Sequence, residues 1–412
     1  MFRNRHRNRD SSDVATTSTR RLSVTMHRPR VSVAATVCAV VVAGSFVTST
    51  VQAQSADASS TPHSSSQVAF RVDASTNPSA TENALRGVSC PSAVFCMSVG
   101  YYVNAAVDKT LAERWDGLQW TTSPSVSPSL TSNYLDGVSC TSASFCMAVG
   151  AQGQGSLQTS LIEYWNGRAW APSPSVDLSS TDALNAVSCA SARFCMAVGD
   201  AVVNGVHHTY VERWNGRRWS LSPSITLGVA NNDLLGTACA SPSFCLAVGE
   251  WVSSGLTRTL VERWNGARWK LSASRNPGAM DLLNGVACAS AKFCEAVGNQ
   301  VQGASTKTLA ERWNGRTWAT VSSSPNASGT LWGVACPRTK LCDAVGSVQV
   351  GAASRTLVEH WTGKRWIIAN SANPSGRDGF NGVSCASLSV CKPVGFEVVG
   401  SDVYDSLIER GA

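Results

Sequence analysis

Residues 135–150, LDGVSCTSASFCMAVG, and residues 160–170, SLIEYWNGRAW, make up one unit of a repeat that runs through most of the chain. The first cysteine of the unit recurs at steps of 50, 49, 50, 49, 48 and 49 residues. Its copies are Cys90, Cys140, Cys189, Cys239, Cys288, Cys336 and Cys385. A second cysteine follows each of them six residues later. A fixed period of this length predicts an architecture built from stacked, similar units.

Each unit has the pattern of four short strands, which we call A to D. In the first copy they are expected at residues 85–90, 95–103, 110–115 and 118–122. Most copies place Asn-Gly or Asp-Gly between C and D, which predicts a two-residue type I′ hairpin. With that turn, Glu262 should face Trp269, and Trp264 should lie diagonal to it. The repeat therefore predicts an all-β, seven-bladed β-propeller with four antiparallel strands per blade.

The two ends of the chain indicate how the ring closes. The last unit stops just after its strand C, Leu407 to Arg410, where strand D should follow. Phe70 precedes Cys90 by twenty residues, as Trp120 precedes Cys140. We therefore expect an N-terminal strand around Phe70 to supply the outer strand of the last blade, which would leave no sheet edge exposed at a gap.

The paired cysteines are expected to form one disulfide per blade. In an exported chain disulfides are favoured, and the intervals between pairs do not cluster four ligands as a zinc site requires, so no metal is expected. The expected pairs are Cys90–Cys96, Cys140–Cys146, Cys189–Cys195, Cys239–Cys245, Cys288–Cys294, Cys336–Cys342 and Cys385–Cys391.

The N-terminal region has the pattern of a secretory signal. Residues 1–53 combine eight Arg with an apolar stretch and end in small residues, and a start at Met26 would give a signal of ordinary length. Residues 54–66 are expected to be a Ser/Thr/Ala-rich linker, and residues 67–412 the propeller. The export route, Sec or twin-arginine, stays open. After removal of the signal we expect a secreted protein with no membrane span.

The net charge of +7 belongs almost wholly to the leader. Residues 1–53 contain eight Arg and two Asp, whereas the rest of the chain has 26 basic and 25 acidic residues. On this balance we expect no nucleic-acid partner for the folded part. The oligomeric state is not indicated by the sequence.

The unit resembles the Kelch motif over residues 67–410. Its elements are Val149-Gly150, then Glu163-Tyr164-Trp165, then Trp170, although a variable residue replaces the second Gly of the motif. The layout is also similar to that of bacterial seven-bladed lectins. Galactose oxidase shares the Kelch propeller, and the resemblance would imply a copper site. That site needs His and Tyr ligands, which the few histidines of this chain do not supply, so no cofactor is expected.

A residue that is present in every blade is expected to serve the architecture. The repeated glutamates should therefore bind backbone or Arg partners rather than act as glycosidase carboxylates. They are Glu113, Glu163, Glu212, Glu262, Glu311, Glu359 and Glu409.

Positions that break the repeat are better ligand-binding candidates, particularly on the face formed by the B–C and D–A loops. Aromatic, amide and charged side chains there suit a sugar ring. The candidates are Tyr101, Tyr102, Asn133, Tyr134, His207, His208, Trp251, Arg258, Trp332 and Phe380. The alternative for each of these residues is sequence variation without function, at a loop position that tolerates substitution.

The residue after the second cysteine changes from Met or Leu in blades one to four to a charged side chain in blades five to seven. We call Glu295, Asp343 and Lys392 the charged trio. They are expected to form either an ion network between blades or a polar pocket near the axis.

The leading functional hypothesis is a secreted propeller that binds extracellular glycan or cell-surface ligands. The alternatives are a protein-interaction or cell-wall-associated scaffold and a polysaccharide-active enzyme, a glycosidase or lyase. The fold alone does not decide among them.

Overall fold

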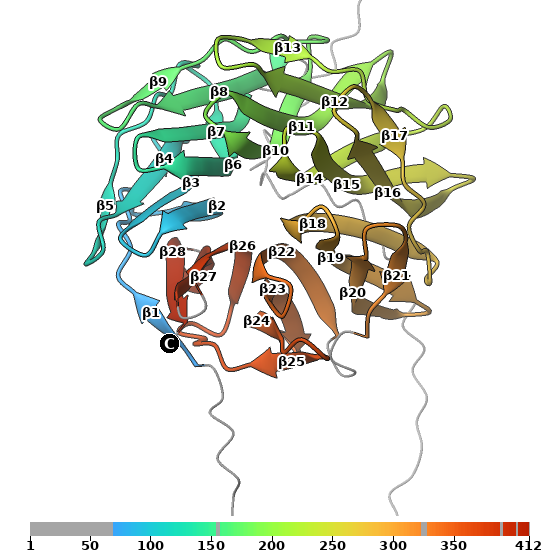
Figure 1. The fold of residues 1–412 in the computed structure, drawn as a ribbon. Coiled ribbons are helices and arrows are strands. Elements are labelled where there is room, and N and C mark those ends of the chain that lie inside the picture. The colour runs from blue at the N-terminus through green and yellow to red at the C-terminus, as the bar shows by residue number, and fades with distance from the viewer. Residues whose placement is uncertain (1–68, 154–156, 323–327, 388–389, 401–402, 412) are drawn as a thin grey trace, which may run out of the picture. The chain divides into compact units, whose positions relative to one another are not determined.

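The computed structural model describes residues 69–153, 157–322, 328–387, 390–400 and 403–411. The predicted signal at 1–53 and linker at 54–66 lie outside the described residues. The described strands form seven four-stranded antiparallel sheets arranged as the blades of a ring (Figure 1). This confirms the predicted all-β, seven-bladed propeller.

Each blade is a meander whose first strand lies nearest the centre of the ring (Figure 1). Blades one to three contain β2 (Asn83–Ser92), β3 (Phe95–Asn104), β4 (Val107–Trp115) and β5 (Trp120–Thr122); β6 (Asn133–Ser142), β7 (Phe145–Gln152), β8 (Thr159–Trp165) and β9 (Trp170–Pro172); and β10 (Asp182–Ser191), β11 (Phe194–Val203), β12 (Val206–Trp214) and β13 (Trp219–Leu221).

Blades four to seven continue the same order. They contain β14 (Asn232–Ser241), β15 (Phe244–Ser253), β16 (Leu256–Trp264) and β17 (Trp269–Leu271); β18 (Met280–Ser290), β19 (Phe293–Gln302), β20 (Ser305–Trp313) and β21 (Trp318–Thr320); β22 (Gly329–Arg338), β23 (Leu341–Val350), β24 (Ala353–Trp361) and β25 (Trp366–Ala369); and β26 (Asp378–Ser387), β27 (Val390–Val399) and β28 (Val403–Gly411), with β1 (Phe70–Asp73).

The ring closes through β1, as predicted. This strand pairs antiparallel with β28, so that Phe70 lies opposite Gly411 and Val72 lies opposite Glu409. The Phe70 side chain is buried with Phe380 and Leu407 in the core between blades six and seven. The last blade is therefore assembled from both ends of the described chain, and the outer edge of β28 is covered.

The predicted register of the C–D hairpin was wrong by two residues. Trp264 lies directly opposite Trp269, and Glu262 lies opposite Leu271. The connection has four residues rather than two, because Asn265 Oδ1 accepts the backbone N–H groups of Ala267 and Arg268 and so closes a wider loop. Only Gly266 takes a positive φ there, 96°, whereas a type I′ turn needs two such residues. Strand D accordingly begins at the second Trp of each unit.

All seven predicted disulfides are present, one at the A–B hairpin of each blade. Each joins cysteines that are six residues apart, so each closes a short loop. The second cysteine of each pair is buried in an interblade core, for example Cys195 against Met147 and Val149 of blade two.

Removing one of these disulfides should have a modest effect on stability. For the double variant Cys189→Ala/Cys195→Ala we expect the free energy of unfolding to fall by about 2 kcal/mol, because the crosslink restricts only a short loop in the unfolded chain. Guanidinium unfolding followed by Trp fluorescence would measure it. An unchanged midpoint would contradict a bracing role for the bond.

Across the residues that the structure describes, no helix has the length and apolar character needed to span a membrane.

Candidate ligand-binding site

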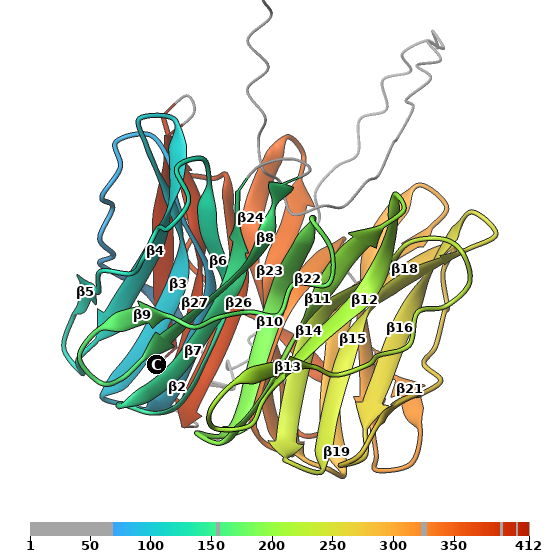
Figure 2. The same cartoon turned by 90° about the horizontal axis from the view of Figure 1, so that it is seen from above.

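The strands of every blade run between two faces of the ring. The B–C hairpins and D–A connections form one face, which we call the loop face; the A–B hairpins and C–D loops form the other, the disulfide face. In Figure 2 the hairpin that joins β3 to β4 lies at the upper edge and the hairpin that joins β18 to β19 at the lower edge.

Four predicted candidates lie together at the B–C hairpins of blades three and four. His207 and His208 lie on β12 opposite Val202 and Ala201 of β11. In the next blade, Trp251 of β15 lies opposite Arg258 of β16. These four predicted residues therefore belong to two adjacent hairpins of the loop face.

Trp251 packs at the junction between these two blades. Its half-buried indole lies against a core formed by Val198 and Val211 of blade three and Ala247 of blade four. Successive side chains of a strand point to opposite faces, so Asp200, two residues after Val198 on β11, faces the same junction. An indole and a carboxylate are thus directed into one junction from its two sides.

His207 is held there by two carboxylates from neighbouring blades. Its Nδ1 lies 2.6 Å from Asp200 Oδ2 and 3.2 Å from Asp233 Oδ1 of β14. Hydrogen bonding to Asp200 and then to Asp233 raises the pKa of His207 to about 10, so the imidazole stays protonated at neutral pH. Glu250 of β15 lies opposite Asp233, and burial raises its pKa to about 7, with the charge of Asp233 adding to this shift. Two residues after Val248, which packs against blade five, Glu250 faces the next junction and not His207. We call Asp200, His207 and Asp233 the acidic junction.

Two groups of described residues have the composition of a cation site. One is Asp200, His207 and Asp233, whose candidate donor atoms all lie within 4.8 Å of one another. Two carboxylates and an imidazole suit a divalent cation, but a protonated His207 already neutralises part of their charge.

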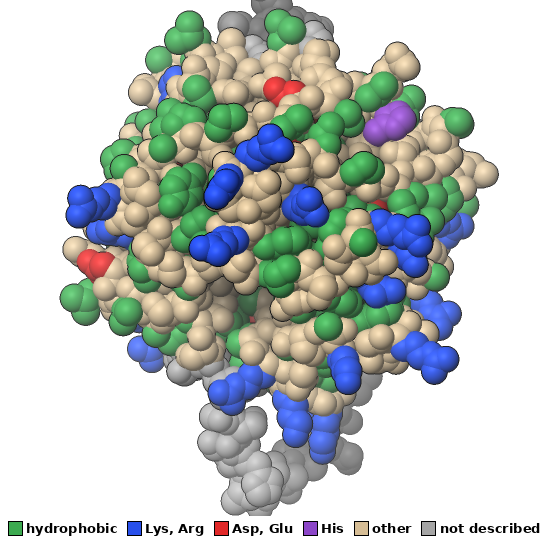
Figure 3. All heavy atoms as spheres, turned by 45° about the horizontal axis from the view of Figure 1, so that its top comes forward, with side chains coloured by type: hydrophobic (Ala, Val, Ile, Leu, Met, Phe, Trp, Pro, Cys, Tyr) green, Lys and Arg blue, Asp and Glu red, His purple; other side chains and the backbone are tan. Residues whose placement is uncertain are grey.

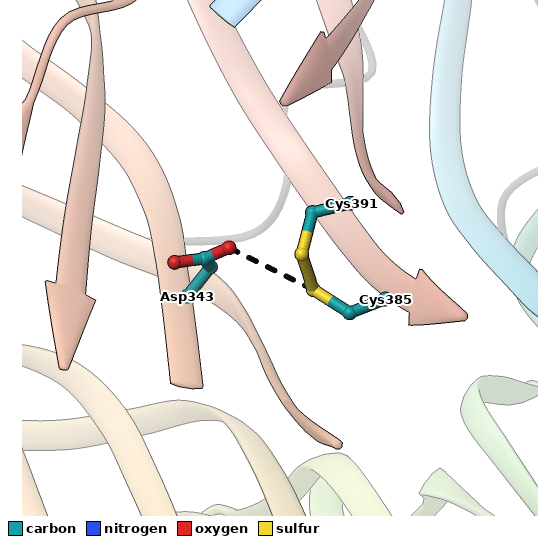
Figure 4. Close-up of side chains that lie close together, drawn as sticks. All are labelled: Asp343, Cys385 and Cys391. Atoms are coloured by element: carbon teal, nitrogen blue, oxygen red, sulfur yellow. Dashed lines mark hydrogen bonds between the residues drawn. A yellow bond between two sulfur atoms is a disulfide. The ribbon is translucent and has the colours of Figure 1, made fainter. Parts of the chain in front are cut away.

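The second group is Asp343 with Cys385 and Cys391, shown in Figure 4. These two cysteines are joined to each other, so they have no thiolate to offer a metal. Asp343 Oδ2 lies 3.7 Å from Cys385 Sγ, which is a packing contact between blades six and seven.

Tyr101 and Tyr134 form a separate aromatic group at blades one and two. The Arg86 guanidinium lies over both rings, 4.7 Å and 5.1 Å from their centroids. Arg86 also forms an ion pair with Asp136. Burial raises the pKa of the Tyr101 phenol above its ordinary value, so the hydroxyl stays protonated and donates a hydrogen bond to Glu82 Oε1 at 2.5 Å. Both tyrosines are buried, so the structure uses them to join the first two blades.

Two other candidates are not available on the surface. Phe380 is fully buried and takes the place of the Leu that precedes the bulge in the other innermost strands, so placing it on the loop face was wrong. Asn133 is also fully buried, and its Oδ1 accepts the N–H of Ser129 in the D–A connection. An Asn or Asp does the same in other blades, so Asn133 belongs to the repeat. Tyr102 and Trp332 are half-buried.

The repeated glutamates bind the backbone, as predicted. Glu163 accepts the N–H of Val126, and Glu212 accepts the N–H of Val176, each at 3.1 Å. Ile225 and Arg275 donate in the same way to the glutamates of blades four and five. Each donor lies in the connection that enters the blade from its predecessor. These four carboxyl groups therefore fasten the interblade connections, and all seven repeated glutamates are fully buried.

Among the described residues, the ion pairs of the charged trio do not cross between blades, and all three side chains are almost fully buried, so the expected interblade network and the expected pocket near the axis were both wrong. Each member pairs within its own blade: Glu295 with Arg312, Asp343 with His360, and Lys392 with Asp73. These partners are cross-strand neighbours or lie on β1, so they satisfy the buried charge locally. Glu295 and Asp343 are almost fully buried, and a polysaccharide would have no access to them.

Asp200, Asp233 and Glu250 were not among the residues predicted from the sequence. A signal for two of them exists: the position after each Val-Gly differs in every blade, although its neighbours repeat. Its occupants are Tyr101, Ala151, Asp200, Glu250, Asn299, Ser347 and Phe396. This position lies at the loop-face end of strand B. Each blade therefore has a different side chain at the end where a ligand would bind.

No family model and no curated protein matches the sequence. Solved structures with a similar fold include YCF48 bound to a D1 peptide, at 15% identity and a TM-score of 0.50, covering 83% of this chain and 96% of that one. They also include the WD40 β-propeller domain of Doa1, at 12% identity and a TM-score of 0.51, covering 83% and 97%. At these identities the likeness shows the fold alone: a seven-bladed β-propeller.

Proposed function

We propose that this protein is a secreted binding propeller whose acidic junction, together with Trp251, recognises an extracellular glycan. The observation that carries the proposal is the position of a half-buried indole at the same blade junction as two carboxylates and an imidazolium. An indole offers an apolar face to the C–H groups of a sugar, and charged groups around it can hydrogen-bond its hydroxyls. We include in the same proposal the resemblance of the repeat to Kelch motifs and to seven-bladed lectins.

The charge of the junction narrows the class of sugar. Asp200 and Asp233 flank a single imidazolium, so the site carries net negative charge. Like charges repel in a partly dry site. We therefore infer a neutral or amino sugar as ligand, and not a uronic or sialic acid.

Secretion is the second part of the proposal. It is supported by the Arg-rich, apolar leader of the sequence and by seven disulfides, which persist in oxidising compartments.

Glycan-array binding by the purified protein tests the proposal. We expect binding to a neutral or amino sugar, and we expect Trp251→Ala to weaken it by at least tenfold, since an aromatic contact of this kind contributes about 1–2 kcal/mol or more with its buried area. Tyr102→Ala, another half-buried aromatic on the loop face, is the matched control and should bind normally. Equal losses in both variants, or binding to acidic sugars alone, would count against the site.

A protein segment is the second candidate ligand. YCF48, a propeller of similar fold, binds a D1 peptide in its solved structure, and the net negative charge of the acidic junction would suit a basic peptide. Recovery of a defined protein in pull-downs, without binding to any glycan and with loss on Trp251→Ala, would favour it.

A further inference from the structure

The charges of the folded part are unevenly divided between the two faces. The A–B hairpins and C–D loops of blades two to six carry exposed Lys and Arg side chains, which we call the basic arc. Its members are Arg168, Arg193, Arg217, Arg218, Arg268, Lys292, Arg316, Arg338, Lys340, Lys364 and Arg365. Figure 3 shows this face obliquely, with blue side chains spread over it and little red.

Among the described residues, the face that carries the basic arc has a single acidic side chain in its loops. Among the A–B hairpins and C–D loops that the structure describes, Asp116 of blade one is the only acidic residue. None of the side chains of the basic arc takes part in an ion pair with a described residue. The near-neutral total charge of the propeller therefore conceals a basic face, because the compensating carboxylates are buried or lie on the loop face.

Part of the arc surrounds a hollow. Arg193 of the A–B hairpin and Arg217 of the C–D loop line a shallow depression of about 370 Å³ in blade three, together with Asn215 and Gly216. Guanidinium groups bind carboxylate, sulfate and phosphate through paired hydrogen bonds, and most members of the arc are Arg. This depression has the size and chemistry to take a single anionic group.

We propose that the basic arc is a second binding surface, and that it takes an anionic polysaccharide whose repeating units carry carboxylate, sulfate or phosphate groups. A linear polyanion fits because the cations are spread along successive blades and not gathered in one pocket. In the described residues, no large aromatic side chain is exposed on these loops, whereas single-stranded nucleic acid binds by stacking on such groups.

A lipid surface fits the arc less well than a polymer does. Insertion into a membrane interface requires apolar side chains at the tips of the loops. At the tips that the structure describes, large exposed apolar residues are present only in blade one, as Val94 and Leu118, outside the basic arc. A polymer held on the disulfide face would leave the loop face free, so the propeller could bind a charged matrix and a second ligand together.

Binding to polygalacturonate, a carboxylate polymer, and to dextran sulfate tests this inference, with neutral dextran as the blank. We expect binding at low salt that weakens steeply as salt rises. In Arg217→Gln/Arg218→Gln the affinity should fall about tenfold. The slope of log affinity against log salt concentration should become less steep by about one to two, because fewer counterions are released on binding. The control Lys307→Gln/Arg355→Gln removes two exposed cations near the loop face and should bind as the unmodified protein does.

Three results would overturn the inference: no binding to either polymer at low salt, equal losses in the two double variants, or tighter binding to double-stranded DNA or to phosphatidylglycerol vesicles than to the polymers. The proposed glycan site on the opposite face is tested separately, because Trp251→Ala should leave polymer binding unchanged.

Discussion

As pH rises from 5 to 9, the folded protein should become progressively easier to unfold. The cause is the set of buried glutamates that fasten the interblade connections. Burial raises the pKa of Glu163 and Glu262 to about 8 and that of Glu113 and Glu311 to about 7. In the unfolded chain the same groups titrate near their ordinary value of 4.5.

The direction follows from counting bound protons. Between pH 4.5 and pH 8 the folded state holds protons on these carboxyl groups that the unfolded state has already released, so raising the pH favours unfolding. The stabilisation is complete below pH 4.5 and is lost by the time the pH passes the folded-state values of 7 to 8. One pKa unit corresponds to about 1.4 kcal/mol, so shifts of this size correspond to at most about 3–5 kcal/mol per carboxyl.

Guanidinium unfolding at pH 5, 6, 7, 8 and 9 would measure the effect. In Glu163→Gln/Glu262→Gln the profile should flatten, because Gln still offers an oxygen to the Val126 and Ile225 N–H groups but does not ionise. Asp116→Asn is the matched control: this exposed carboxyl has a lowered pKa, so it is ionised throughout the range. A profile that is equally steep in the Gln variant would contradict the assignment.

Most of the fold could be predicted from the sequence because a propeller repeats its determinants in every blade. The cysteine pairs and the truncated last unit were enough to predict the disulfides and the role of Phe70, since each rests on spacing along the chain. The C–D register could not be obtained in this way. Asn-Gly is compatible with a two-residue turn and with the observed four-residue loop, and the side-chain bonds of Asn265 decide between them.

The candidate site was predictable only in part, because it is formed by residues that meet across blades. His207 and Trp251 could be predicted because each departs from the repeat. Asp200 and Asp233 lie in adjacent blades, and only the closed ring brings both of them to His207. Phe380 shows the opposite error. It departs from the repeat in identity, but it keeps the buried position of the Leu it replaces.

Asp73→Ala should be among the most destabilising substitutions in the protein. Asp73 lies on β1 and forms an ion pair with Lys392, whose side chain is 1% exposed. Lys392 also lies 3.7 Å from the centroid of the Trp115 ring in blade one, so it joins the N-terminal strand, the last blade and the first. Removing the carboxylate leaves a buried ammonium group without its partner, which costs about 3–5 kcal/mol. Thermal and guanidinium unfolding would measure the loss.

Lys392→Met should restore much of that loss when it is combined with Asp73→Ala. Met97, Met147 and Met196 fill the equivalent position of other blades and are fully buried, so the core accepts this side chain. A double-mutant cycle separates the coupling from the two single effects. If the double variant were no more stable than Asp73→Ala alone, the loss would arise from the pairing of β1 with β28 and not from the uncompensated charge. If Asp73→Ala were neutral, β1 would not close the ring in solution, because only closure buries Lys392 against Asp73.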